Sequence, residues 1–180
     1  MILSNGIANF KNNYHDKKIN YSITRLMLNR EELKAKNIEF WFEFKKYMQK
    51  VRSTNGRRMN WLNYPSDVKN IYIRLQVDAT GARLCMDIQP KDAGIREIIW
   101  EQMGELKKVL ENAMKYETIW IERMHLEDGR DFSRILWELN NVSFYAENDR
   151  PIIFEFLKSR LLEFDEFYQE FKEILISLND

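Results

Sequence analysis

The segment GRRMNWLNYP, from Gly56 to Pro65, combines side chains that could contact nucleic acid. Arg57 and Arg58 follow a glycine, and Trp61 is the first of two aromatic residues close behind them. Arginine side chains neutralise phosphates, and an aromatic ring can stack on a base. The same residue types also occur in an ordinary turn with two solvated arginines, followed by a tryptophan buried in the core. The segment therefore has a binding interpretation and a structural one.

Basic residues precede this segment. Lys45 and Lys46 lie in the helix expected before it, with two more cations just beyond them. Residues 1–60 contain 13 Lys and Arg against 5 Asp and Glu, a balance of +8, whereas residues 61–180 contain 15 against 23, a balance of −8. This asymmetry favours an anionic partner such as DNA or RNA for the first third of the chain, unless the two parts pair with each other in one compact domain. The contact residues of such a partner would be Lys45, Lys46, Arg57, Arg58 and Trp61.

Four polar residues around a predicted hairpin give a second candidate site, for catalysis. Some restriction-type nucleases carry an acid on one strand and, on the next, an acid or Gln, any residue and a Lys. Asp78 with Gln89-Pro90-Lys91 follows this order loosely, and Asp87 adds a carboxylate. In such a site the carboxylates hold Mg²⁺ and the lysine lies near the attacking water. The proline inside the motif argues against it, so we expect a binding domain rather than an enzyme, with Mg²⁺ as a cofactor only in the nuclease alternative.

The composition excludes several other kinds of site. Cys85 is the only cysteine, which rules out an intrachain disulfide and a cysteine-rich zinc site. The two histidines, His15 and His125, are far apart, and no glycine-rich loop is present to hold the phosphates of a nucleotide cofactor. The first residues lack the apolar stretch of a secretory signal, and no apolar run approaches the roughly 20 residues of a membrane span. We expect a soluble cytoplasmic protein with no membrane contact.

Hydrophobic periodicity predicts three helices and five strands. Asn29 and Glu32 have the spacing of a capping box for the first helix, and Pro151 is placed to begin the last. The expected elements, in order, are a helix at 30–51, strands at 60–64, 70–78 and 82–89, a helix at 93–116, strands at 118–126 and 133–139, and a helix at about 151–178.

The apolar faces of these elements indicate how they pack. Residues 71–77 and 82–88 each alternate apolar and polar side chains, so they form an antiparallel hairpin with one buried face. The helix at 93–116 has an apolar stripe that can cover that face. We therefore predict an α+β fold of two layers, with helices packed on a mainly antiparallel sheet. Residues 29–180 form this single domain, and residues 1–28, whose periodicity is weak, form a partly ordered arm.

The last helix has more apolar surface than one packing stripe needs. Phe154 and Leu162 lie off the main line of its apolar residues. Core packing on two sides accounts for this surface, and so does a homodimer or a partner protein that binds along the helix. A protein-interaction module is thus a third possible function.

Several segments, taken in order, resemble one prokaryotic family, the domain of unknown function 4268 (DUF4268). They are FWFEFKKYMQKV at 40–51, NGRRMNWLNYP at 55–65, IYIRLQVDATGARLCMDI at 71–88, Trp120, SRILWEL at 133–139 and FLKSRLLEFDEFY at 156–168. The resemblance covers roughly residues 38–175 and implies a compact α+β domain. Members of the family occur fused to or beside nuclease-like and restriction-type proteins, so the resemblance implies a nucleic-acid context, and it brings no catalytic residues. It favours an accessory module of a nucleic-acid-processing or defence system.

Overall fold

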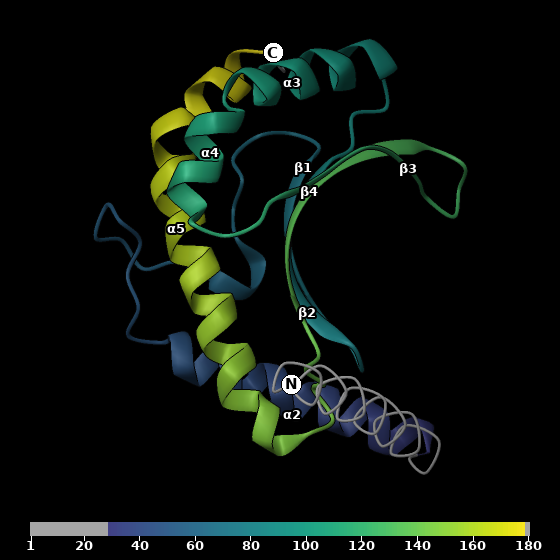
Figure 1. Cartoon of the computed structure of the whole chain (residues 1–180), viewed down its shortest axis with the longest axis vertical. Helices are drawn as coiled ribbons and strands as arrows, with labels where there is room; N and C mark the ends of the chain where they lie inside the picture. The colour runs from purple at the N-terminus through teal and green to yellow at the C-terminus, as the bar shows by residue number, and fades with distance from the viewer. Residues whose placement is uncertain (1–28, 179–180) are drawn as a thin grey trace, which may run out of the picture.

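The computed structural model describes residues 29–178, in which four strands form one antiparallel sheet and helices cover one of its faces (Figure 1). The strand order is β1-β2-β4-β3. The predicted α+β fold with a long last helix is therefore confirmed, while the arm predicted for residues 1–28 lies outside the described residues. The elements are α2 (Arg30–Met48), η1 (Trp61–Asn63), β1 (Ile71–Val77), β2 (Gly81–Ile88), α3 (Ala93–Glu105), α4 (Lys107–Met114), β3 (Ile119–His125), β4 (Asp131–Asn140), η2 (Glu147–Asp149) and α5 (Arg150–Ser177).

Both hairpins pair as their alternating sequences predict. One row of the sheet runs from Leu75 on β1 through Leu84 on β2 to Trp137 on β4, and all three side chains face the helices. Because side chains alternate along a strand, the positions between them form the opposite face. On β3 the pairing with β4 shifts between Ile121 and Met124, which interrupts the ladder near the tip of the second hairpin.

The helix α5 lies at the centre of the core. Pro151 occupies its first turn, where the missing backbone N–H is not needed. Leu161 and Phe164 are fully buried, and the ring of Phe164 packs 5.9 Å from that of Trp137 on β4 and stacks on Tyr168. Although α5 is long, no helix among residues 29–178 is both long and apolar enough to cross a membrane.

The predicted strand at residues 60–64 is wrong. Trp61 and Tyr64 are both buried, and they are three residues apart. A strand would point residues three apart to opposite faces, whereas one 3₁₀ turn points them to the same side. The chain therefore forms η1, and two strands rather than three precede α3.

The predicted helix at residues 93–116 is two helices. It breaks at Leu106, whose φ of −84° and ψ of −2° depart from helical values, two residues after Gly104. Figure 1 shows that α3 and α4 run in different directions and that α4 lies along α5. Beyond the break, α4 turns to follow α5, and its residues Leu110 and Met114 are fully buried.

Candidate functional site

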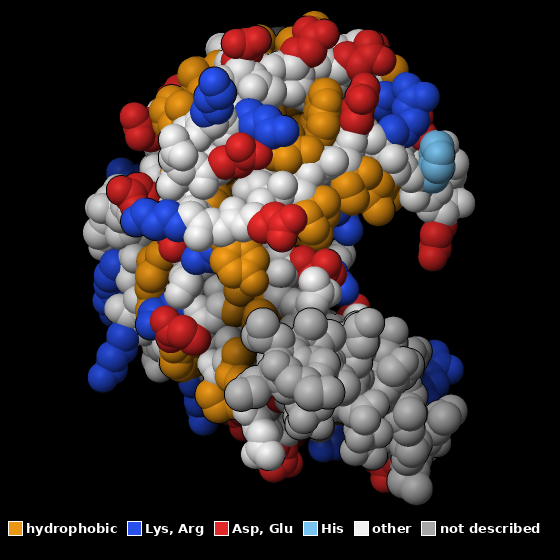
Figure 2. Space-filling model, viewed as in Figure 1, with side chains coloured by type: hydrophobic (Ala, Val, Ile, Leu, Met, Phe, Trp, Pro, Cys, Tyr) orange, Lys and Arg blue, Asp and Glu red, His pale blue; other side chains and the backbone are white. Residues whose placement is uncertain are grey.

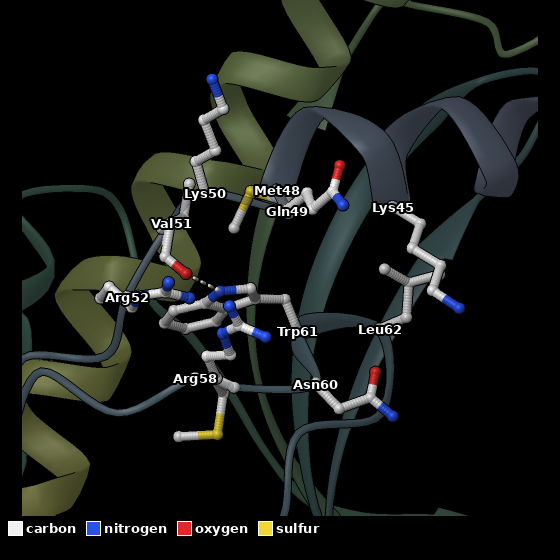
Figure 3. Close-up of a pocket in the computed structure, with 11 residues that line it drawn as sticks. Lys45, Met48, Gln49, Lys50, Val51, Arg52, Arg58, Asn60, Trp61 and Leu62 are labelled. Atoms are coloured by element: carbon white, nitrogen blue, oxygen red, sulfur yellow. Dashed lines mark hydrogen bonds between the residues drawn. The ribbon is translucent and has the colours of Figure 1, made fainter.

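A pocket of about 650 Å³ opens where α2 ends and the chain turns toward η1 (Figure 3). Its apolar lining includes Met48, Trp61 and Leu62. Its cations come from both sides of the turn: Lys45, Lys50, Arg52 and Arg58. All four of these cationic residues are exposed, so the pocket has an apolar floor and a basic rim.

The loop that carries the arginines is a short hairpin. Ser53 N donates to Arg57 O at 3.0 Å, and Gly56 N donates to Ser53 O at 2.8 Å. Gly56 has a φ of +77°, a conformation that costs glycine little, which explains why the sequence has Asn55-Gly56 at this point. The turn predicted there is confirmed, and it directs the chain back along itself.

This hairpin sets two cations directly opposite each other. Arg52 and Arg58 form an isolated antiparallel bridge, and like charges in that position repel. The sequence from residue 45 to 60 contains six Lys and Arg and no Asp or Glu. Among the ion pairs formed within the described part of the chain, none involves these six side chains. The rim thus keeps a concentration of positive charge without a carboxylate to balance it.

A buried carboxylate on α5 fixes the base of the loop. Asp165 is fully buried, and its Oδ2 accepts hydrogen bonds from Ser53 Oγ at 2.7 Å and Thr54 N at 2.8 Å. Its Oδ1 accepts from Tyr64 OH at 2.7 Å and from Gln169 Nε2 at 3.3 Å. Asp165 therefore ties the loop at residues 53–54 and Tyr64, the residue after η1, to the core helix.

The protonation states suit this role. Burial alone would raise the pKa of Asp165, but the hydrogen bonds from Thr54, Ser53 and Tyr64 outweigh it and hold that pKa below its ordinary value. Burial, together with the hydrogen bond to Asp165, raises the pKa of Tyr64 far above its ordinary value. The carboxylate therefore stays charged and the phenol stays a donor at neutral pH.

Trp61 belongs to the floor of the pocket and not to its surface. Its side chain is 3% exposed, and its Nε1 donates to Val51 O at 3.2 Å, as the close-up shows (Figure 3). This agrees with the structural interpretation of the tryptophan, since a buried ring offers no free face for a base. Of the other predicted contacts, Arg57 lies at the exposed turn and Lys46 sits over the ring of Phe42 at 4.5 Å, and neither lines the pocket.

The structure separates Asp78 from the other predicted nuclease residues. Asp78 lies at the turn between β1 and β2, where it accepts hydrogen bonds from Thr80 and pairs with Arg83. Asp87 on β2 lies opposite Tyr72 on β1, and Tyr72 is six residues from Asp78. At the rise of a strand, Asp87 and Asp78 are therefore about 20 Å apart. Residues 29–178 contain no group of three His, Cys, Asp or Glu side chains placed to hold a metal ion.

The remaining nuclease candidates have other neighbours. Gln89 accepts from Arg74 at 3.4 Å, and Lys91 is exposed after the end of β2. Asp87 is fully buried, and both Arg74 and Arg134 donate hydrogen bonds to it. The alternating pattern placed Asp87 on the outward face, but the partner from β4 was not predicted because strand order cannot be read from local sequence.

The last helix is mostly a core helix. Phe154, which lay off its main apolar line, packs against Phe40 and Phe44 of α2, with ring centroids 5.2 and 5.3 Å apart. A shallow groove of about 550 Å³ remains beside its first turns, with Tyr116 and Ile152 in its lining. Packing on two sides therefore accounts for most of the apolar surface of α5, for which the sequence allowed either core packing or a partner.

A comparison with models of protein families identifies the family to which this chain belongs. The model described as Domain of unknown function (DUF4268) matches residues 37–172, more than two thirds of the chain. The chain belongs to the DUF4268 family. No match was found among curated proteins or among solved structures. The DUF4268 region contains the whole basic pocket and also Asp165, so the loop and its anchor lie within the part that defines the family.

Proposed function

We propose that this DUF4268 domain binds nucleic acid through backbone phosphates, as an accessory module of a nucleic-acid-processing system, with the rim of the basic pocket as the contact. The observation that carries the proposal is the bridge between Arg52 and Arg58, which sets two exposed cationic residues opposite each other, neither of them in an ion pair within the described chain. Such repulsion lowers the stability of the free protein and is relieved when an anion binds between the cations.

The burial of Trp61 decides which part of the nucleic acid is contacted. A ring that is 3% exposed cannot act as a stacking platform, so the bases are not held there. The phosphates of the backbone are held there instead, because Lys45, Lys50 and the two bridge arginines all present positive charge at the rim. The binding is therefore expected to depend strongly on salt and weakly on sequence.

The anchored loop supports tight positioning of these cations. Asp165 already orders residues 53 and 54 in the free protein, so less conformational freedom is lost when the ligand binds. The resemblance to this family implies a nucleic-acid context, which supports the proposal. A contact of this kind needs no metal ion and no catalytic residue.

Fluorescence anisotropy with labelled single- and double-stranded DNA and RNA, measured over a salt series with Mg²⁺ present, tests the proposal. The decisive variant is Arg52→Gln/Arg58→Gln, which removes two cations from the rim. If both arginines contact duplex phosphates, the slope of log K against log salt becomes shallower by about 1.8. The matched control is Arg123→Gln/Arg130→Gln, which removes two exposed arginines from the β3–β4 hairpin and should leave the slope unchanged.

Two results would count against the proposal. One is the absence of binding even at low salt for all four nucleic acids. The other is an equal loss in the control variant, because that would indicate a general attraction to positive charge and no defined site. Cleavage of the labelled strands in the same samples would instead reveal a nuclease activity.

A further inference from the structure

The outer face of the sheet carries a second cationic cluster. Figure 1 shows the sheet curving away from α3, α4 and α5, and no described helix is drawn across its concave side. The space-filling view shows the molecule hollowed on that side (Figure 2). The loop after α2 lies on the opposite, helical side. Three strands contribute to the cluster on the concave face: β1 gives Arg74 and Gln76, β2 gives Asp87, and β4 gives Arg134.

One buried carboxylate orients both guanidinium groups. Arg134 donates to Asp87 through Nε at 2.6 Å and through Nη2 at 2.8 Å, a bidentate pair. Arg74 donates to the same carboxylate through Nη1. The hydrogen bond to Asp87 is the largest cause that raises the pKa of Arg134, so this guanidinium is firmly charged. Asp87 itself is fully buried beneath them, although it lies on a face that no described helix covers.

The cluster has one positive charge more than it has negative charge. Within the described residues, the ion pairs of Arg74 and Arg134 involve Asp87 alone. The neighbouring cluster on the same face shows the opposite arrangement, because Arg83 pairs with two carboxylates, Asp78 and Glu138. An arginine on this face can thus be fully neutralised, and the pair at Asp87 is not.

Hydrogen-bond donors remain available around the cluster. The Arg74 side chain is 39% exposed and lies over the ring of Tyr72, 4.7 Å from its centroid. Its Nη2 donates to Gln89 Oε1 at 3.4 Å. The other end, Gln89 Nε2, is buried and has no partner among the described residues. Buried donors are almost always satisfied in folded proteins, so this one indicates a missing acceptor.

We propose that the concave face binds an oxyanion, the carboxylate or phosphate group of a small ligand, between Arg74 and Arg134. Asp87 is the positioning residue that holds both guanidinium groups toward the ligand. The exposed ring of Tyr72 borders the site and can contact the body of the ligand. This site is separate from the basic pocket, and it goes beyond the proposed binding of nucleic acid.

NMR of the arginine side chains tests this site directly. The Nε–Hε signals of Arg74 and Arg134 are followed while sodium phosphate, in one series, or sodium succinate, in another, replaces sodium chloride at constant ionic strength. Saturable shifts at both arginines are expected in at least one series, and the responding series identifies the group. Arg74→Gln should weaken the response of Arg134 about tenfold, the loss expected for one charge-assisted hydrogen bond. Arg123→Gln is the matched control and should change nothing, because Arg123 is exposed and pairs with Asp131, which also contacts Arg96 of α3.

The outcome is decisive in either direction. Shifts that do not saturate, or that are equal at Arg123, would overturn the proposal, since they indicate only weak pairing with any exposed guanidinium. An unchanged response of Arg134 in the Arg74→Gln variant would overturn it as well. Arg74 is partly exposed, so its replacement is compatible with folding, and the dispersion of the spectrum verifies this. The Arg52→Gln/Arg58→Gln variant should respond to phosphate and succinate at Arg74 and Arg134 as the wild type does. The two proposed sites are therefore tested independently of each other.

Discussion

Replacing Asp165 with asparagine should destabilise the protein and loosen the basic loop. The carboxylate accepts three short hydrogen bonds, from Ser53 Oγ, Thr54 N and Tyr64 OH, at 2.7 to 2.8 Å. Asparagine keeps one acceptor oxygen, loses the charge and points an NH₂ group at donors. Because the side chain is fully buried, water cannot replace the lost partners.

The size of the effect follows from the kinds of hydrogen bond involved. A hydrogen bond to a charged group contributes about 1 kcal/mol more than a neutral one, so three of them represent about 3 kcal/mol. The amide is less costly to bury than the charge, which reduces the expected loss of unfolding free energy to about 2 kcal/mol. For a chain of this length that corresponds to a decrease in Tm of roughly 4 to 8 °C.

Thermal and urea unfolding, followed by circular dichroism at pH 7, measure this loss. Glu166→Gln is the matched control, because it makes the same acid-to-amide change at the next, exposed residue of α5 and should have little effect. The folded-state pKa of Asp165 is lowered, so its contribution is present above the unfolded pKa of about 3.9 and is lost as the pH falls through the folded pKa. In strong acid the free energy of unfolding of the wild type should therefore no longer exceed that of the Asp165→Asn variant. A difference below about 0.5 kcal/mol at pH 7, or one that does not change with pH, would refute this account of the anchor.

Three other changes test separate parts of the structure. Gly81→Ala should cost about 1 to 3 kcal/mol of unfolding free energy, measured by urea unfolding, because a Cβ there would lie 2.7 Å from the backbone oxygen of Leu139. Cys85 is buried, which raises the pKa of its thiol to about 11, so its reaction with a disulfide reagent at pH 8 should be at least roughly 200-fold slower in the folded than in the urea-unfolded protein. Arg58→Gln removes the repulsion with Arg52 and should stabilise the free protein by about 0.5 kcal/mol while it weakens the binding of nucleic acid, a pair of effects that unfolding and anisotropy measure independently.

The local features of the fold were predictable from sequence. The capping box at Asn29 and Glu32 is present, with both of its hydrogen bonds formed. The turn at Asn55-Gly56 and the two alternating strands around Gly81 also follow from residue types and spacing alone. These signals involve residues that are close in sequence, for which the physical preferences of each residue type decide the outcome.

The features that were missed depend on distant partners. The link from Ser53 to Asp165 spans 112 residues, and nothing near either residue indicates it. The cluster on the concave face requires that β4 lie beside β2, so Arg134 could be placed only after the strand order was known. Two cations of the basic pocket, Lys45 and Arg58, were predicted as contacts from the sequence, whereas Lys50 and Arg52 were not. That none of the four forms an ion pair within the described residues is a fact of the tertiary structure.

The order of the strands also bears on how this protein avoids joining its sheet to another. Among the described strands, β1 and β3 are the two edges, and each has a row of backbone groups that face outward. The register shift on β3 interrupts its row beside two exposed charged residues, Glu122 and Arg123, which discourages the addition of a further strand. The edge of β1 is regular, and beyond Ile71, whose backbone N–H donates to Val68 O and whose C=O accepts from Ser66 Oγ, it lacks this protection. Aggregation of this fold by strand addition would therefore begin at β1, and a lysine or proline introduced on that edge is the change that would suppress it.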